Sequence, residues 1–387
     1  MSFIPYGKQE ISQEDIDSVI NVLKSDFLTQ GPQVPAFENS LIQACGAEYA
    51  FSVNSATSAL HISCLALGLR QGDYLWTSPI TFVASANCGL YCGAYIDFVD
   101  IDPATYNMCP TKLESKLKQA KAEGTLPKVI VVVHLCGQPC DMEKIYQLSK
   151  QYGFKIIEDA SHAVGARYKN SKTGDCKYSD ITVFSFHPVK IVTTAEGGAA
   201  LTNNDELAKK LELLRSHGVT RDESLMTEES HGGWYYQQIE LGYNYRMTEM
   251  QAALGVSQMT RLNEFVDRRN ELAVRYDKEL THLPVELPKR LDSTYSSFHL
   301  YILRLKRNEI KLSHKEVFSG LRNAGLGVNL HYIPVHLQPY YQNLGFKAGD
   351  FPEAEKYYKE AISIPIFHSM TDEQQSTSID ILSRVLL

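Results

Sequence analysis

Lys190 is the residue of this sequence best placed to act as a nucleophile. It follows Ser185 by five residues, and Ser185 comes directly after residues 181–184, a β-branched stretch typical of a buried strand. A lysine shielded from water loses its proton more easily and can then attack a carbonyl carbon. The alternative is a solvated lysine without a chemical role.

Asp159 is the second candidate, because it follows the apolar residues 154–157 of another expected strand. A carboxylate buried there costs free energy unless it meets a cation, and the protonated ring nitrogen of a cofactor would be one. A structural salt bridge or a helix cap would satisfy it as well. His162, three residues later, faces the same region if the turn is helical, although a packing role is the alternative.

The third candidate is the small polar turn at residues 53–60, which opens an apolar helix. Free backbone N–H groups and the helix dipole favour a phosphate at such a position, whereas simple capping by Ser55 or Thr57 needs no ligand. Ligands of α/β sheets bind beyond the carboxyl ends of the strands. A phosphate cup, an acid and then a serine and a lysine, in this order, are the groups that pyridoxal phosphate requires.

The elements that must position these groups alternate between strands and helices. Strands are predicted at residues 74–76, 95–99, 128–133, 154–157 and 181–184, with a helix at 143–152. This alternation indicates an α/β domain with a mostly parallel sheet. A long helix from 248 to 280 then leads to a smaller α+β region with a strand at 299–305, a helix at 314–324 and a closing helix after 371. We therefore expect a large domain over residues 1–255 and a smaller one over 256–387.

The composition excludes several classes of protein. The chain has 387 residues and a net charge of −7, which disfavours general attraction to nucleic acid. Neither a secretory signal nor an apolar stretch long enough for a bilayer is found, so we expect a cytoplasmic protein that binds no membrane. Eight cysteines lack a zinc-binding spacing, and no metal site is expected.

Several motifs in fixed order resemble those of the DegT/DnrJ/EryC1/StrS family of sugar aminotransferases. They lie at residues 28–32, 76–88, 185–190, 242–248 and 331–341, so the resemblance covers nearly the whole chain. It implies the aspartate aminotransferase-like fold of pyridoxal-phosphate enzymes, fold type I, with a large mixed, mostly parallel sheet. Ala56 and Ala195 stand where many relatives have glycine, and Gly197 with Gly198 predicts a tight turn.

The resemblance also implies a role for each matching residue. Lys190 would form the Schiff base with pyridoxal 5'-phosphate, Asp159 would bind the pyridine nitrogen, and Phe82 would stack on the ring unless it only packs in the core. The other expected cofactor-binding residues are Ala56, Thr57, His162, Ser185 and Asn244. Asn244 would reach the phosphate bound by a neighbouring subunit, which implies a homodimer with shared active sites. Expected substrate contacts, with packing as the alternative for each, are Tyr6, Thr29, His187, His331 and Tyr332.

The implied reaction moves an amino group from L-glutamate to C4 of a UDP-linked 4-keto-6-deoxy-N-acetylhexosamine, in the branch of the family that serves pseudaminic acid biosynthesis. Alternatives are a family transaminase for another nucleotide-linked sugar and a non-catalytic regulator that binds the cofactor. A dehydratase of the family would have histidine in place of Lys190. Nicotinamide chemistry is disfavoured because no G-x-G-x-x-G motif follows a strand.

Overall fold

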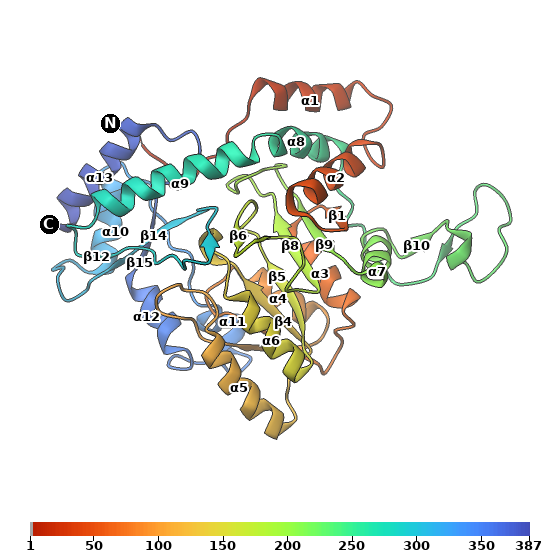
Figure 1. Cartoon of the computed structure of the whole chain (residues 1–387), viewed down its shortest axis with the longest axis horizontal. Coiled ribbons are helices and arrows are strands. Elements are labelled where there is room, and N and C mark those ends of the chain that lie inside the picture. Colours follow the sequence, from red (N-terminus) through yellow and green to blue (C-terminus); the bar gives the residue numbers. More distant parts are fainter. Residues whose placement is uncertain (1–2) are drawn as a thin grey trace.

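The computed structural model describes residues 3–387 and is built around a central sheet of seven strands (Figure 1). In spatial order the strands are β1 (Tyr49–Val53), β9 (Gly198–Thr202), β8 (Ile181–Ser185), β5 (Lys155–Asp159), β4 (Val129–Val133), β2 (Tyr74–Thr77) and β3 (Tyr95–Phe98). Strand β9 is antiparallel to both of its neighbours, and the remaining pairs are parallel. Six strands therefore end at the same edge of the sheet, and all five strands predicted in this region are confirmed.

Strand β4 shows why the sheet is covered on both faces. Val129, Val131 and Val133 pack in one core with helices α3 (Ala56–Ala66), α4 (Ala84–Tyr91) and α7 (Asp205–Arg215). The alternate residues Ile130 and Val132 pack in a second core with α5 (Pro110–Glu123) and α6 (Met142–Tyr152). Successive side chains of a strand point to opposite faces, so a strand of apolar residues alone requires helices on both sides.

The predicted helix from 248 to 280 is wrong in one respect, because it consists of two helices. Helix α8 (Glu249–Met259) packs against α1 (Gln13–Leu23) and α2 (Gln33–Cys45), and α9 (Leu262–Glu279) continues towards the C-terminal region. At the break, the guanidinium of Arg261 binds the carboxylate of Asp15 in α1 at 2.6 Å. The apolar periodicity continues across the break because Met259, Leu262 and Phe265 all enter one core.

The C-terminal region has its own sheet and core. Strands β12 (Val285–Glu286), β14 (Tyr301–Leu305) and β15 (Ala361–Ile364) are antiparallel, and α9, α10 (His314–Asn323) and α13 (Asp372–Leu386) pack on them. Shorter elements are β6 (Arg167–Tyr168), β7 (Ser171–Lys172), β13 (Thr294–Tyr295), α11 (Pro339–Gln342) and α12 (Pro352–Glu360). Ile4 pairs with Leu326 and joins this core, so the first described residues lie with the C-terminal region.

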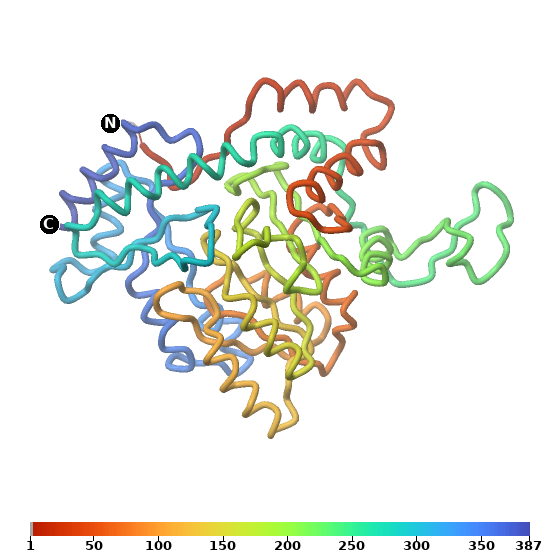
Figure 2. Tube along the Cα trace, in the orientation of Figure 1, coloured from red at the N-terminus to blue at the C-terminus, as the bar shows by residue number. Residues whose placement is uncertain are grey.

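One segment extends away from the rest of the chain (Figure 2, green). It contains β10 (Val219–Thr220) and β11 (Gln237–Gln238), and residues 221–236 connect them. Trp234 and Leu241 are about three-quarters exposed, at 74% and 75%. We call residues 219–241 the arm. Across residues 3–387, no helix is both long and apolar enough to cross a membrane.

Candidate active site

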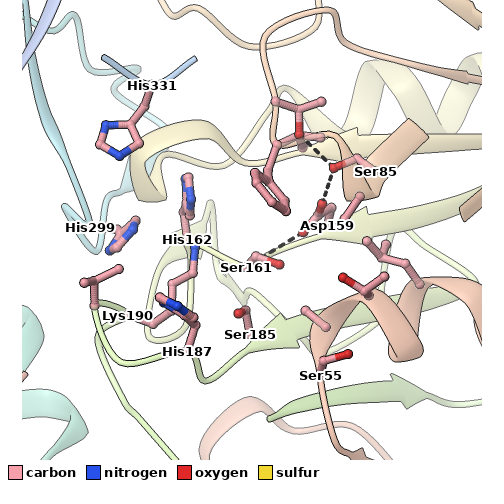
Figure 3. A pocket seen from close by; sticks show the side chains of 18 of the residues that line it. Ser55, Ser85, Asp159, Ser161, His162, Ser185, His187, Lys190, His299 and His331 are labelled. Carbon is pink, nitrogen blue, oxygen red and sulfur yellow. Dashed lines mark hydrogen bonds between the residues drawn. The ribbon is translucent and has the colours of Figure 1, made fainter. Parts of the chain in front are cut away.

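A cavity of about 440 Å³ lies at the edge where the six strands end (Figure 3). Eleven of the thirteen residues predicted for the site line it: Tyr6, Ala56, Thr57, Phe82, Asp159, His162, Ser185, His187, Lys190, His331 and Tyr332. They come from widely separated parts of the chain. The sheet, its flanking loops, the N-terminal stretch and the C-terminal region therefore bring together the groups that the sequence analysis selected.

Lys190 lies in the loop between β8 and β9 and points into this cavity. Burial lowers the pKa of its amine to about 8, against the opposing effect of the Asp159 carboxylate. Its Nζ makes no hydrogen bond or ion pair with any residue from 3 to 387. An amine with a lowered pKa and no partner can react with an electrophile.

Asp159 is the last residue of β5 and is 5% exposed. Its Oδ2 accepts a hydrogen bond from the hydroxyl of Ser85 at 2.6 Å, and its Oδ1 accepts one from the backbone N–H of Ser161 at 3.2 Å. The hydroxyl of Thr81 lies 2.7 Å from that of Ser85. These contacts fix the carboxylate, and each oxygen keeps a lone pair for a further donor.

The N-terminus of α3 forms another wall of the cavity. Ser55 caps this helix by accepting a hydrogen bond from the N–H of Ser58, while the N–H groups of Ala56 and Thr57 keep no partner within the described chain. Gly198 packs so closely against the start of α3 that a Cβ atom at this position would lie 2.5 Å from the backbone nitrogen of Ala56. Free N–H groups at a helix start are suited to an anion such as phosphate.

The predicted turn at Gly197 and Gly198 is wrong. Gly198 begins β9, and the chain bends at Ala195 and Glu196 instead. Ala195 has a left-handed backbone with φ of 65°. Close packing against α3 is therefore the reason for glycine at position 198. The strained left-handed conformation is instead adopted by Ala195.

Three histidines and a tyrosine form the side of the cavity nearest the C-terminal region. The rings of His162 and His299 are 4.4 Å apart, and the Nε2 atom of His162 lies 3.1 Å from the hydroxyl of Tyr332. Burial, followed by the charges of Lys190 and His331, lowers the pKa of His162 well below 6.5. Burial also lowers the pKa of His299, and that of His331 to about 4. These imidazoles are neutral at physiological pH.

Thr29 and Asn244 do not line the cavity. Thr29 is exposed in the loop between α1 and α2. Asn244 is exposed at the base of the arm, where its backbone forms an isolated β-bridge with Ser216. The carbonyl of Asn244 also accepts a hydrogen bond from the side chain of Asn54 at 3.4 Å. Within one chain, neither side chain reaches the groups around Lys190.

The sequence analysis gave no cofactor-binding or substrate-binding role to several polar residues of the cavity wall. They are Ser55, Thr81, Ser85, Ser161, Glu196 and His299. Ser85 lies within the motif at 76–88, which could have identified it, whereas His299 lies in a strand prediction without a chemical signal. His299 is 4% exposed, and its Nδ1 has no partner within the described residues.

The family model for the DegT/DnrJ/EryC1/StrS aminotransferase family matches residues 9–383. The chain belongs to this family. It is 38% identical to the UDP-4-amino-4,6-dideoxy-N-acetyl-beta-L-altrosamine transaminase of Campylobacter jejuni serotype O:2, over 99% of this chain and 97% of that protein. It is 37% identical to the spore coat polysaccharide biosynthesis protein SpsC of Bacillus subtilis, over 98% and 96%.

Solved structures agree with this assignment. Helicobacter pylori PseC, an aminotransferase involved in the biosynthesis of pseudoaminic acid, superposes with a TM-score of 0.90 at 30% identity, covering 100% of this chain and 99% of that one. The PLP form of Spr1654 from Streptococcus pneumoniae superposes with a TM-score of 0.87 at 28% identity, with 100% coverage of both. The predicted fold type I is confirmed, and the chain is an aminotransferase that depends on pyridoxal phosphate. The cavity fits this cofactor, because it holds a free amine, a buried carboxylate and unpaired N–H groups.

Proposed function

We propose that this chain transfers an amino group from L-glutamate to C4 of a UDP-linked 4-keto-6-deoxy-N-acetylhexosamine, as a step in pseudaminic acid biosynthesis. The observation that carries the proposal is the convergence of Lys190, Asp159 and the start of α3 on one cavity. The sugar is inferred from the altrosamine transaminase and PseC, to which the chain is similar along nearly its whole length.

The cofactor would be held at three points. Lys190 would bind its aldehyde carbon, Asp159 would accept a hydrogen bond from its ring nitrogen, and Phe82 would cover one face of the ring. The phosphate would be bound by the N–H groups of Ala56 and Thr57, the hydroxyl of Thr57 and the hydroxyl of Ser185. Phe82 is 58% exposed, so its ring is available for stacking.

The chemistry that pyridoxal phosphate supplies is electron withdrawal from the substrate carbon that loses its proton. Lys190 would carry that proton, because an amine with a pKa of about 8 can both accept and release one near neutral pH. Asp159 would hold the positive charge of the ring nitrogen in place through its fixed carboxylate. The neutral histidines around Lys190 add no competing positive charge.

The substrate side of the cavity would be formed by segments outside the seven-stranded sheet and by the loop of Lys190. Tyr6, His187, His331 and Tyr332 are the residues we assign to it. His162 would position this side rather than bind the cofactor directly, since both of its ring nitrogens already have partners. Thr29 would contact substrate only in an oligomer in which it lies at the cavity of a neighbouring subunit.

A homodimer would complete the site. Asn244 is exposed and does not line the cavity of its own chain. The arm next to it exposes the apolar side chains of Trp234 and Leu241. We propose that Asn244 reaches the phosphate site of a second subunit. Analytical ultracentrifugation of the intact protein should show a dimer, whereas a monomer that is fully active would contradict shared sites.

The deciding experiment is an amination assay with purified, cofactor-loaded protein, L-glutamate and a panel of 4-keto nucleotide sugars. The UDP-linked N-acetylhexosamine should be the preferred acceptor, and dTDP-linked sugars serve as matched controls. Preference for another sugar would support the alternative, a family transaminase for a different nucleotide-linked keto sugar. The chain is also 37% identical to SpsC, a spore coat polysaccharide biosynthesis protein. Cofactor binding without amination of any sugar would indicate a regulatory protein.

A further inference from the structure

We propose that Tyr332 is a fixed hydrogen-bond donor of the cavity, that His162 positions it, and that its hydroxyl binds an oxygen atom of a substrate. The inference rests on the proposed function and specifies one of its contacts. The oxygen would belong to the nucleotide sugar or to a carboxylate of the amino donor. Both are hydrogen-bond acceptors, so the chemistry at Tyr332 is the same.

The first step is the position of the proton on His162. The backbone N–H of Cys136 lies 3.2 Å from Nδ1 of His162. A backbone N–H can only donate, so Nδ1 is the acceptor and has no proton of its own. The imidazole is neutral, because burial lowers the pKa of His162 well below 6.5. Its single N–H proton is therefore on Nε2.

The second step is the direction of the hydrogen bond to Tyr332. Nε2 of His162 lies 3.1 Å from the Tyr332 oxygen, and it donates because it carries the proton. The tyrosine oxygen is the acceptor, so its own O–H remains available. Burial raises the pKa of Tyr332, so the phenol keeps its proton. Within residues 3–387 this O–H has no second partner.

The third step is the surroundings of the hydroxyl. Tyr332 lines the same cavity as Lys190, and its ring centroid lies 6.2 Å from that of Phe82 and 6.1 Å from that of His162. Figure 3 shows His162 projecting into this cavity beside Lys190 and His299. A polar O–H in a largely buried cavity is costly to leave unpaired when ligand excludes water. An oxygen of the bound substrate would satisfy it.

The test uses the full-length, cofactor-loaded protein and the substitution Tyr332→Phe, which removes only the hydroxyl. Isothermal titration calorimetry would measure the dissociation constants of UDP-N-acetylglucosamine and 2-oxoglutarate, two probes that need no turnover. We expect binding of at least one probe to weaken about three- to tenfold, which corresponds to one lost hydrogen bond. The probe that is weakened identifies the source of the oxygen. Tyr340→Phe, at an exposed tyrosine that does not line the cavity, is the matched control.

Two results would overturn the proposal. The first is that Tyr332→Phe binds both probes as tightly as the unmodified protein. The second is that its weaker binding is explained by a lower content of bound cofactor, which the absorbance of the cofactor measures. Both readouts are independent of amination, so failure of the sugar assay and failure of this contact are distinguishable.

A second comparison tests the positioning role of His162. Asparagine can replace the Nδ1 acceptor but cannot reach Tyr332, whereas glutamine can place an amide N–H near the position of Nε2. His162→Asn should therefore weaken probe binding as much as Tyr332→Phe does, and His162→Gln should restore part of it. The double variant of Tyr332→Phe and His162→Asn should bind no more weakly than Tyr332→Phe alone. Additive losses would show that the two residues act separately.

Discussion

The buried carboxylate of Glu249 caps the start of helix α2 by accepting a hydrogen bond from the backbone N–H of Gln33 at 2.6 Å. It also accepts one from Val34 at 3.2 Å, and α2 has no side-chain cap of its own. Glu249 follows the motif at 242–248, and Gln33 follows the motif at 28–32. This contact joins two motifs that are more than 200 residues apart in the sequence.

Replacing Glu249 with alanine should destabilise the protein by about 2 kcal/mol, because two buried N–H groups and a helix N-terminus lose their acceptor. Urea unfolding followed by circular dichroism measures the change. Glu206→Ala is the matched control, since Glu206 is exposed in the first turn of α7. A similar, small effect at both positions would contradict the capping role.

Ala195→Gly should stabilise the protein by about 1 kcal/mol. Ala195 has φ of 65°, a left-handed conformation that costs alanine free energy and that glycine adopts freely. Ala122→Gly, at an exposed position of α5, should instead destabilise by about 1 kcal/mol. Thermal unfolding of both variants gives the signs, and a loss of stability at both positions would refute the assigned strain.

Lys190→Ala should abolish amination and remove the visible absorption of the covalently attached cofactor. The protein should still fold, because Lys190 makes no ion pair with another described residue. Lys172→Ala, at an exposed lysine, is the control for loss of a positive charge. Turnover by the Lys190 variant at the rate of the unmodified protein would exclude this residue as the nucleophile.

The rate at which the cofactor-free protein attaches pyridoxal phosphate should rise with pH, with a midpoint near 8. Burial lowers the pKa of Lys190 to about 8, so the reactive neutral amine dominates above this pH and the ammonium below it. Stopped-flow absorbance measures the rate, with Nα-acetyl-lysine as the reference for an unperturbed amine. A midpoint equal to that of the reference would show that the amine is not desolvated.

The parts of the site that could be predicted are those in which one residue type is unusual at its position. Asp159 at the end of an apolar strand and Lys190 after another are such cases, and both line the cavity. Ser85 could not be assigned in this way. A serine near the start of a helix suggests a cap, and its hydrogen bond to Asp159 depends on the strand order, which places β2 two strands from β5.

The break between α8 and α9 escaped prediction for a related reason. The apolar spacing of residues 248–280 fits one helix, because Met259 and Leu262 enter the same core on either side of the break. What marks the break is the contact of Arg261 with Asp15, a residue far away in the sequence. Local periodicity reports which face is buried, and it contains no information about partners that tertiary structure brings near.

The cavity is assembled from two kinds of scaffold. Asp159 and Ser185 are the terminal residues of neighbouring strands in a rigid sheet, whereas Tyr6, His299 and Tyr332 belong to the chain's N-terminal stretch and its C-terminal third. Substitutions in these outer segments can change which sugar the cavity accepts, while Asp159 and Ser185 keep their positions at the ends of the strands. Because the outer segments can change without moving the strand ends, one ancestral enzyme could diversify into enzymes for many different carbohydrates.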